Sequence, residues 1–210
     1  MIFGHKGFVL FTYGLRKNIL LPTMAGAADR CIIPEHPFEI EHLTDLMMSD
    51  RNKNPSNYAV VLVSEGATMA SHSEMSFEGE EVDMFGHKKL GGIGDKVAND
   101  LKVLSPKYNN GRPVSVVNQR LSYLVRCGEP DAFDSIVPMA FGNIALDLIL
   151  GNTTGRLISL RNGIYDHVTL DIITGRSKVI DVPKYYDVER MRPKYESFIK
   201  QPMFIMTGDD

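Results

Sequence analysis

The chain has 210 residues, with 23 Lys and Arg against 26 Asp and Glu, a formal net charge of −3 and 43% hydrophobic residues. This length allows one domain or a two-lobed one, and the hydrophobic content excludes an intrinsically disordered chain. The near-neutral charge gives no electrostatic reason for binding nucleic acid or an anionic membrane surface. We therefore expect no nucleic acid and no membrane among its partners.

The cysteine content and the first apolar segment bear on where the protein works. Cys31 and Cys127 are too few for a disulfide framework or a cysteine-rich zinc site. The apolar segment 8–22 is interrupted by Arg16 and Lys17, so it is neither a membrane span of about 20 apolar residues nor a signal peptide. These features predict a cytoplasmic protein with reduced thiols.

Segments of strand and helix character alternate along the chain. The segments with strand character are 30–34, 58–63, 156–159 and 167–171, and residues 113–126 form either one strand or a bent pair. The segments with helical periodicity are 38–49, 95–104, 134–150 and 187–200. Asp134 or Ser135 is the expected N-cap of the longest helix, Pro138 is expected in its first turn, and Gly151 is its expected stop.

This alternation predicts an α/β fold of three layers, with a mostly parallel sheet flanked by helices. The polar stretch 66–94 is expected to be a long loop, and loops of that length are usually functional or disordered. Parallel sheets bind ligands at the carboxyl ends of their strands. That rule indicates two candidate sites, at residues 64–66 and 126–128.

Three charged residues near these strand ends are candidates for ligand binding. Glu65 could accept hydrogen bonds from sugar hydroxyls or act as a base, and the alternative is a solvated carboxylate. Arg126 could bind a phosphate ahead of the long helix, or form a structural ion pair with Glu129 or Asp131. Arg120 could approach the same site or belong to a surface ion pair.

The remaining motifs give weaker evidence about function. The glycine-rich segment 91–96 lacks the spacing of a phosphate-binding P-loop, and a flexible lead-in to the following helix is expected there. The six histidines have no zinc-binding spacing, so we expect no metal site on this chain. The residues alone therefore predict an α/β domain that binds a small anionic ligand.

Several segments together resemble the 6-phosphofructokinase family. Residues 126–134 (RCGEPDAFD) and the helix that follows are similar to its sugar-phosphate-binding strand, loop and helix. Residues 54–67 resemble its central strand, which ends in a substrate-binding Glu, and residues 25–35 resemble the junction before that strand. Residues 3–5 (FGH) resemble its substrate loop, usually Met/Phe-Gly-Arg.

The resemblance covers about residues 1–8 and 24–175 in family order. It implies an enzyme that phosphorylates fructose 6-phosphate to fructose 1,6-bisphosphate in glycolysis, with Mg²⁺ and with ATP or pyrophosphate as donor. Carried over by position, the substrate-binding residues are Phe3, Gly4, His5, Glu65, Arg120, Tyr123 and Arg126. In this carry-over Glu65 holds sugar hydroxyls, Tyr123 and Arg126 hold the 6-phosphate, and residues 3–5 line the reacting end of the sugar.

The sequence also departs from the family. His5 stands where the family has Arg, and Tyr123 where many bacterial members have His. Val117 stands where those members place a phosphate-binding Arg from the neighbouring subunit, for which Arg120 is the expected substitute. Residues 9–23 match poorly, and neither the GGDG-type donor loop nor the TIDND-type segment with the catalytic base is present.

We therefore predict the C-terminal, substrate-binding half of a two-lobed phosphofructokinase-like fold. It would comprise a domain over residues 1–186 and a C-terminal helical tail over residues 187–210, without catalytic residues and inactive alone. Such a half would expose an apolar patch, and would form a homo-oligomer or pair with a complete phosphofructokinase subunit. The alternatives are a non-catalytic sugar-phosphate-binding or regulatory subunit, and an α/β protein-interaction scaffold.

Overall fold

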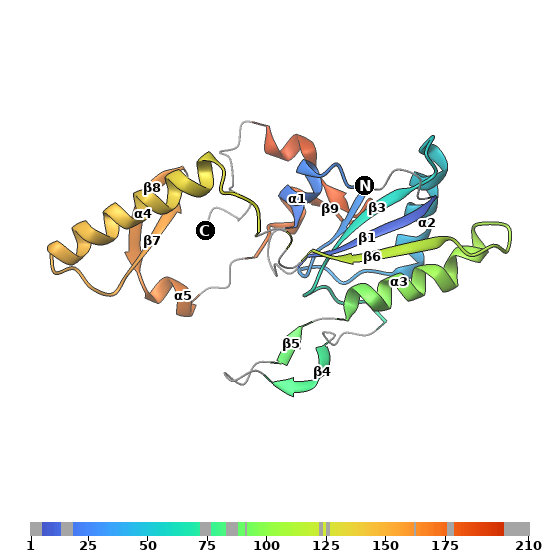
Figure 1. Cartoon of the computed structure of the whole chain (residues 1–210), viewed down its shortest axis with the longest axis horizontal. Helices are drawn as coiled ribbons and strands as arrows, with labels where there is room; N and C mark the ends of the chain where they lie inside the picture. The colour runs from blue at the N-terminus through green and yellow to red at the C-terminus, as the bar shows by residue number, and fades with distance from the viewer. Residues whose placement is uncertain are drawn as a thin grey trace.

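The computed structural model describes residues 6–13, 19–71, 77–82, 88–90, 92–121, 124, 127–161, 163–175 and 179–199. Its strands are β1 (Gly7–Tyr13), β2 (Arg30–Ile32), β3 (Ala59–Ser64), β4 (Phe77–Val82), β5 (Lys88–Leu90), β6 (Ser115–Arg120), β7 (Arg156–Arg161), β8 (Ile164–Thr169), β9 (Tyr186–Asp187) and β10 (Arg192–Pro193). Its helices are α1 (Leu20–Ala25), α2 (Ile40–Lys53), α3 (Ile93–Leu104), α4 (Ala132–Leu150), α5 (Asp171–Gly175) and α6 (Val182–Tyr185), with 3₁₀ turns η1 (Ser105–Lys107) and η3 (Tyr195–Phe198). Figure 1 shows their arrangement.

Four parallel strands form the central sheet, in the order β2-β3-β1-β6. Strand β1 lies in the middle, with Tyr13 opposite Ser64 of β3 and Thr12 opposite Arg120 of β6. Because all four strands run in the same direction, their carboxyl ends lie at one edge of the sheet. The expected parallel sheet is therefore confirmed.

Strand β1 was not among the strands predicted from the sequence. Phe8, Val9 and Leu10 are at most 2% exposed at the centre of the sheet, although residues 9–23 match the family poorly. Aromatic and branched residues fill this strand, as the buried middle of a parallel sheet requires. It is therefore a core element of the fold.

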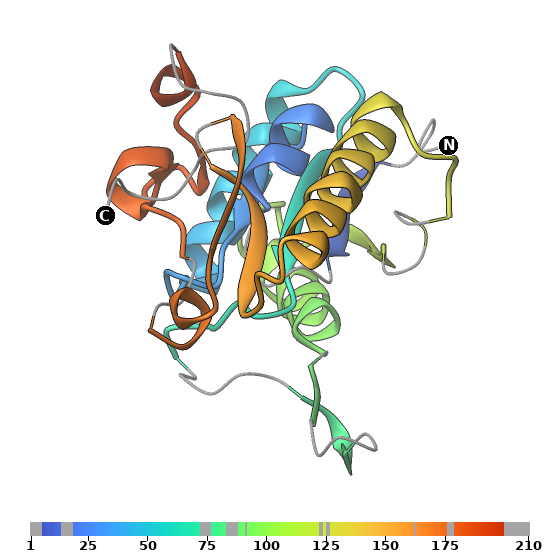
Figure 2. The same cartoon turned by 90° about the vertical axis from the view of Figure 1, so that its left-hand side faces the viewer.

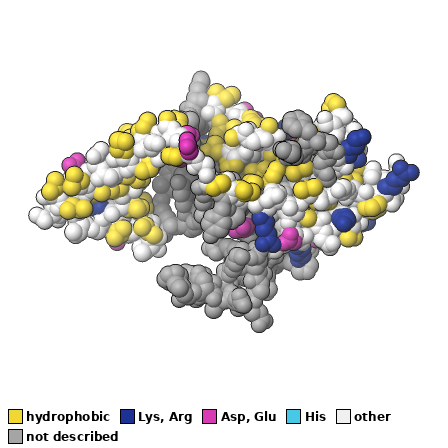
Figure 3. Space-filling view, in the orientation of Figure 1, with side chains coloured by type: hydrophobic (Ala, Val, Ile, Leu, Met, Phe, Trp, Pro, Cys, Tyr) yellow, Lys and Arg dark blue, Asp and Glu magenta, His cyan; other side chains and the backbone are white. Residues whose placement is uncertain are grey.

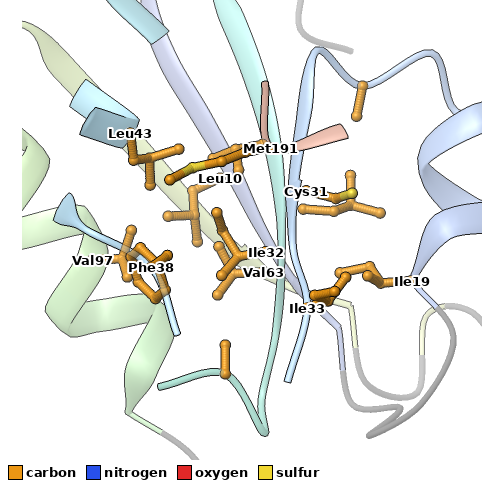
Figure 4. Packing of buried hydrophobic residues seen from close by; sticks show 14 of the residues in the cluster. Leu10, Ile19, Cys31, Ile32, Ile33, Phe38, Leu43, Val63, Val97 and Met191 are labelled. Carbon is orange, nitrogen blue, oxygen red and sulfur yellow. The ribbon is translucent and has the colours of Figure 1, made fainter. Parts of the chain in front are cut away.

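Helices cover both faces of the sheet and confirm the three-layer fold. Figure 4 shows Leu43, Phe38 and Val97 on one side of the sheet, where α2 and α3 pack, and Ile19 and Cys31 on the other, where α1 begins. These side chains belong to one cluster of buried apolar residues. A core of this kind supplies the main part of the stability of such a domain.

The C-terminal segment is not the helix that its periodicity predicted. Residues 187–199 contain β10, η3 and the end of β9. Helix is excluded here because Met191 has φ +45° and Pro193 lacks an amide hydrogen. The segment packs on the edge strand β2: Cys31 N donates to Met191 O (2.8 Å), and Tyr186 Oη donates to Cys31 O (2.7 Å).

The longest helix begins earlier than expected. Asp131 is its N-cap, because Asp134 N donates to Asp131 Oδ1 (3.0 Å) and the Asp134 carboxylate accepts from Asp131 N (3.4 Å). Pro138 consequently lies inside the helix and not in its first turn, while Gly151 ends the helix as predicted. Figure 2 shows α4 beside the antiparallel hairpin of β7 and β8, whose two strands were also expected.

The polar stretch 66–94 is not simply a loop. It contains the antiparallel strand pair β4 and β5, and α3 begins at Ile93, two residues before the predicted start of the helix at Asp95.

Candidate functional site

The carboxyl end of β3 is a tight, buried turn that positions Glu65. Ala67 N donates to Ser64 O (3.0 Å), and Gly66 N donates to Ser64 Oγ (3.4 Å). Ser64 and Ala67 are fully buried, whereas Glu65 is half-buried at the first corner of the turn. The turn therefore holds the Glu65 carboxylate at the edge of the sheet.

The chain after this turn is fixed as well. Phe38 N donates to Thr68 O (3.1 Å), and Ala70 N donates to Phe38 O (2.9 Å), which forms a parallel bridge between residues 38 and 69. Backbone hydrogen bonds therefore anchor the chain on both sides of Glu65.

The carboxyl end of β6 carries Arg120 on the far side of β1. The Arg120 guanidinium forms an ion pair with Asp95 in the first turn of α3, and Asn118 Nδ2 donates to the other Asp95 oxygen (2.6 Å). The hydrogen bond from Arg120 lowers the pKa of the Asp95 carboxyl. Both side chains are about half exposed (48% and 58%), so Arg120 belongs to a surface ion pair, one of the two expected roles.

Glu65 and Arg120 lie at the same edge of the sheet. Thr12 of β1 is opposite Val63 on one side and opposite Arg120 on the other, so these two neighbours are two strand spacings apart, about 10 Å. A carboxylate and a guanidinium at the same edge of the sheet suit a ligand with hydroxyls at one end and phosphate at the other.

Helix α3 begins unusually close to the same edge. The ideal Cβ of an alanine at Gly94 would lie 1.9 Å from Thr12 Oγ1, so only glycine lets the first turn of α3 lie on the end of β1. Thr12 Oγ1 in turn donates to Asn118 Oδ1 (3.2 Å). The glycine-rich segment was predicted as a flexible lead-in, but Gly94 is a buried packing position inside the helix.

The remaining predicted site residues, namely Phe3, Gly4, His5, Tyr123 and Arg126, lie outside the described residues and stay predictions. The chain enters β1 at Gly7, opposite the first residue of β6, which is the amino edge of the sheet. The carboxyl end of β1 that adjoins Ser64 is Tyr13, which is not among the predicted site residues.

Among the residues that the structure describes, no three His, Cys, Asp or Glu side chains gather closely enough to hold a metal ion.

The sheet and the helices on its two faces define an α/β domain, and in domains of this class ligands bind at the carboxyl ends of the parallel strands. The family model described as Phosphofructokinase matches residues 19–149, which is more than half of the chain. The chain belongs to the phosphofructokinase family, a family of phosphotransferases, as the resemblance of its motifs predicted.

Curated relatives include both kinds of phosphofructokinase. The chain is 28% identical over 185 residues to a pyrophosphate–fructose 6-phosphate 1-phosphotransferase of Amycolatopsis methanolica, covering 88% of this chain and 49% of the relative. It is 27% identical over 166 residues to an ATP-dependent 6-phosphofructokinase of Streptomyces coelicolor, covering 79% of this chain and 46% of the relative. The chain thus spans about half the length of the curated relatives it matches.

A solved structure shows the same fold. The pyrophosphate-dependent phosphofructokinase of Marinobacter aquaeolei matches 92% of this chain and 46% of its own, with a TM-score of 0.67 at 15% identity. The three-layer fold is therefore shared with a phosphofructokinase that is about twice as long as the matched region.

Proposed function

We propose that this chain forms the fructose 6-phosphate site of a phosphofructokinase and corresponds to the C-terminal half of that fold. The observation that carries the proposal is the position of Glu65. The family resemblance assigns it to sugar hydroxyls, and the anchored turn after β3 holds it half-buried at the ligand-binding edge of the sheet.

The residues of this chain would bind and orient the sugar phosphate. Glu65 accepts hydrogen bonds from hydroxyl groups, and Tyr123 and Arg126, which follow β6, hold the 6-phosphate. Arg120, which forms the ion pair with Asp95, would add positive charge at the phosphate end of the site. Residues 3–5 remain part of the proposal on the strength of the resemblance alone. Phosphoryl transfer depends mainly on such positioning and on charge neutralisation.

The finer features of the reaction belong to the proposal too. The donor is ATP or pyrophosphate with Mg²⁺, and the product is fructose 1,6-bisphosphate, made in the cytoplasm as a step of glycolysis. We assign no residue of this chain to the metal or to proton abstraction, because the resemblance places the metal ligands and the catalytic base in the N-terminal half of the fold. The chain alone is expected to bind the sugar phosphate without turning it over.

A second candidate is a non-catalytic sugar-phosphate-binding or regulatory subunit. It is favoured by the length of the match, which is about half of each curated relative. Both candidates need the same sugar site, and they differ in whether this chain works with a donor-binding half.

Calorimetric titration of fructose 6-phosphate into the purified chain tests the site. We expect saturable binding that Glu65→Gln weakens at least tenfold and Arg126→Ala abolishes. Glu41→Gln, an exposed carboxylate in the first turn of α2, is the matched control and should leave binding unchanged.

The outcomes separate the possibilities clearly. No binding by a folded chain, or equal binding by Glu65→Gln, contradicts the assignment of this edge. Fructose 1,6-bisphosphate produced by the chain alone with either donor contradicts the expectation that it is inactive by itself.

A further inference from the structure

A hydrogen-bonded network of four side chains joins the buried middle strand of the sheet to the Arg120 guanidinium. Thr12 Oγ1 donates to Asn118 Oδ1 (3.2 Å), and Asn118 Nδ2 donates to Asp95 Oδ1 (2.6 Å). The other Asp95 oxygen, Oδ2, accepts the hydrogen bond of the ion pair with Arg120. The network thus runs from β1 through β6 to the first turn of α3, and returns to the last residue of β6.

Each member of this network is oriented by its neighbours. An ionised carboxylate only accepts hydrogen bonds, so the Asn118 amide turns its nitrogen to Asp95 and its oxygen to the Thr12 hydroxyl, which donates. Thr12 is only 3% exposed, and the first turn of α3 lies on it, so the core holds this end of the network. Asp95 is therefore fixed by its helix and by Asn118, whereas the side chain of Arg120 is long and has many rotamers.

The ion pair at the end of the network contributes only modestly to folding stability. Both side chains are about half exposed, and exposed pairs are weak because water competes for both charges. The pair does, however, hold a flexible guanidinium in one place at the edge where the four parallel strands end. A long side chain that is already ordered does not have to be ordered by the ligand, which favours binding.

The position of the guanidinium suits the anionic end of a ligand. On the face of the molecule that Figure 3 shows, the Lys and Arg side chains lie mainly over the sheet and its helices, and few lie over the arm of α4, β7 and β8. Arg120 is the last residue of β6, and it precedes Tyr123 and Arg126, to which the proposed function assigns the 6-phosphate. The ordered guanidinium thus lies at the point where the chain leaves the sheet for those two residues.

We propose that Asp95 is a positioning residue for the phosphate end of the sugar site, where with Asn118 it holds the Arg120 guanidinium ready to bind the phosphate. This inference rests on the proposed function and adds to it a residue that acts through Arg120. The opposite role would be competition, in which Asp95 keeps Arg120 from the phosphate and weakens binding. The contacts favour positioning: Asn118 occupies Asp95 Oδ1, so Arg120 meets the carboxylate at Oδ2 through Nη2. Because a guanidinium has five N–H donors, a contact through this nitrogen is compatible with a second, anionic partner.

Calorimetric titration of fructose 6-phosphate into the full chain and its variants tests this role. Arg120→Ala should weaken binding about tenfold, because it removes a charged group that binds the phosphate. Asp95→Ala should weaken binding about fivefold, because the ligand must then order the Arg120 side chain itself. In a chain that already carries Arg120→Ala, Asp95→Ala should have no further effect, because Asp95 acts through Arg120. A general structural role of Asp95 would weaken binding in both backgrounds.

Two further variants are controls. Asp100→Ala removes one carboxylate from the same helix and should leave binding unchanged. Asp95→Glu keeps the carboxylate and should bind within about twofold of the original chain. Circular dichroism at the temperature of the titration verifies that each variant is folded.

The outcomes distinguish this inference from the proposed function. The inference alone is overturned if binding is indifferent to Asp95→Ala or Arg120→Ala, if Asp95→Ala tightens binding, or if Asp95→Ala weakens it equally without Arg120. In each of these cases, binding that Glu65→Gln weakens leaves the proposed sugar site in place. No binding of fructose 6-phosphate by the folded original chain contradicts the sugar site and the inference together.

Discussion

Replacing Gly94 by alanine tests how the first turn of α3 is seated on the end of β1. The new Cβ would lie 1.9 Å from Thr12 Oγ1, 3.1 Å from Thr12 Cβ and 3.3 Å from Asn118 Oδ1. Non-bonded atoms at this type of contact prefer about 3.5 Å, so α3 or the Thr12 side chain must move by roughly 1.6 Å. Thr12 is itself only 3% exposed, which leaves it little room to give way.

Three free-energy contributions decide whether Gly94→Ala stabilises or destabilises the fold. Overpacking costs about 1–3 kcal/mol and losing the Thr12–Asn118 hydrogen bond costs about 1 kcal/mol, against a helix-propensity gain of about 1 kcal/mol. Gly94→Ala should therefore lower the free energy of unfolding by about 1–3 kcal/mol, measured by urea titration with circular dichroism at pH 7. Asn99→Ala, an exposed position on the same helix, measures the propensity gain alone and should stabilise by about 0.5 kcal/mol.

A double variant makes the argument sharper. Adding Thr12→Ala to Gly94→Ala removes the oxygen at 1.9 Å and should recover part of the loss, which a double-mutant cycle detects as coupling. If Gly94→Ala were as stable as the original chain, or more stable, the close seating of α3 would be refuted.

Three further predictions concern charges around the sheet. Asp50→Ala should lower the free energy of unfolding by about 3–5 kcal/mol in denaturant titration, because the Arg30 guanidinium is only 9% exposed and loses its carboxylate partner. A loss below about 1 kcal/mol would contradict this expectation. Asp29→Asn should raise the free energy of unfolding at pH 7, because burial raises the pKa of Asp29 above 3.8 and the charged carboxylate therefore destabilises the fold as pH rises through that raised value. The advantage of the variant should disappear below pH 3.8. A variant less stable than the original chain at pH 7 would disprove this reasoning. Asp95→Asn should lower the melting temperature at pH 7, because the ion pair with Arg120 lowers the pKa of Asp95 and stabilises the charged carboxylate. The difference in melting temperature should vanish as acid protonates the carboxyl below pH 3.8. A difference that persists at that pH would exclude the ion pair as its cause.

The elements with strong local patterns were predictable from the sequence. Strand β3 is a continuous apolar run, and α2 places Leu43 and Met47 on one buried face, so each sequence pattern matches its surroundings. The capped start of α4 was missed by only a few residues because Asp131 and Asp134 both suit an N-cap.

Strand β1 shows a different kind of error. Phe8 to Tyr13 has all the characteristics of a strand, but the basic residues after it and the poor family match obscured that signal. The C-terminal segment was misjudged because its charge pattern suits a helix, whereas its conformation is determined by hydrogen bonds to β2, which lies about 160 residues earlier in the chain.

Only part of the candidate site could be predicted from the sequence. Glu65 was placed correctly at a strand end, because the end of an apolar run can be read directly. The partner of Arg120 could not be found in this way, since Asp95 lies 25 residues earlier on another element. The role of Gly94 depends on a close contact with Thr12, which no local pattern reports.

The closure of strand β2 by the C-terminal segment has a consequence for biosynthesis. The backbone of Cys31 donates a hydrogen bond to Met191 O and accepts one from Tyr186 Oη, and Cys31 and Tyr186 are separated by 155 positions. During translation the outer edge of β2 therefore remains open until residues 186–191 have left the ribosome, and an open strand edge can pair with other chains. Contacts so distant along the chain also slow folding. A ribosome-bound chain ending before residue 186 should consequently depend on chaperones more than the finished protein does.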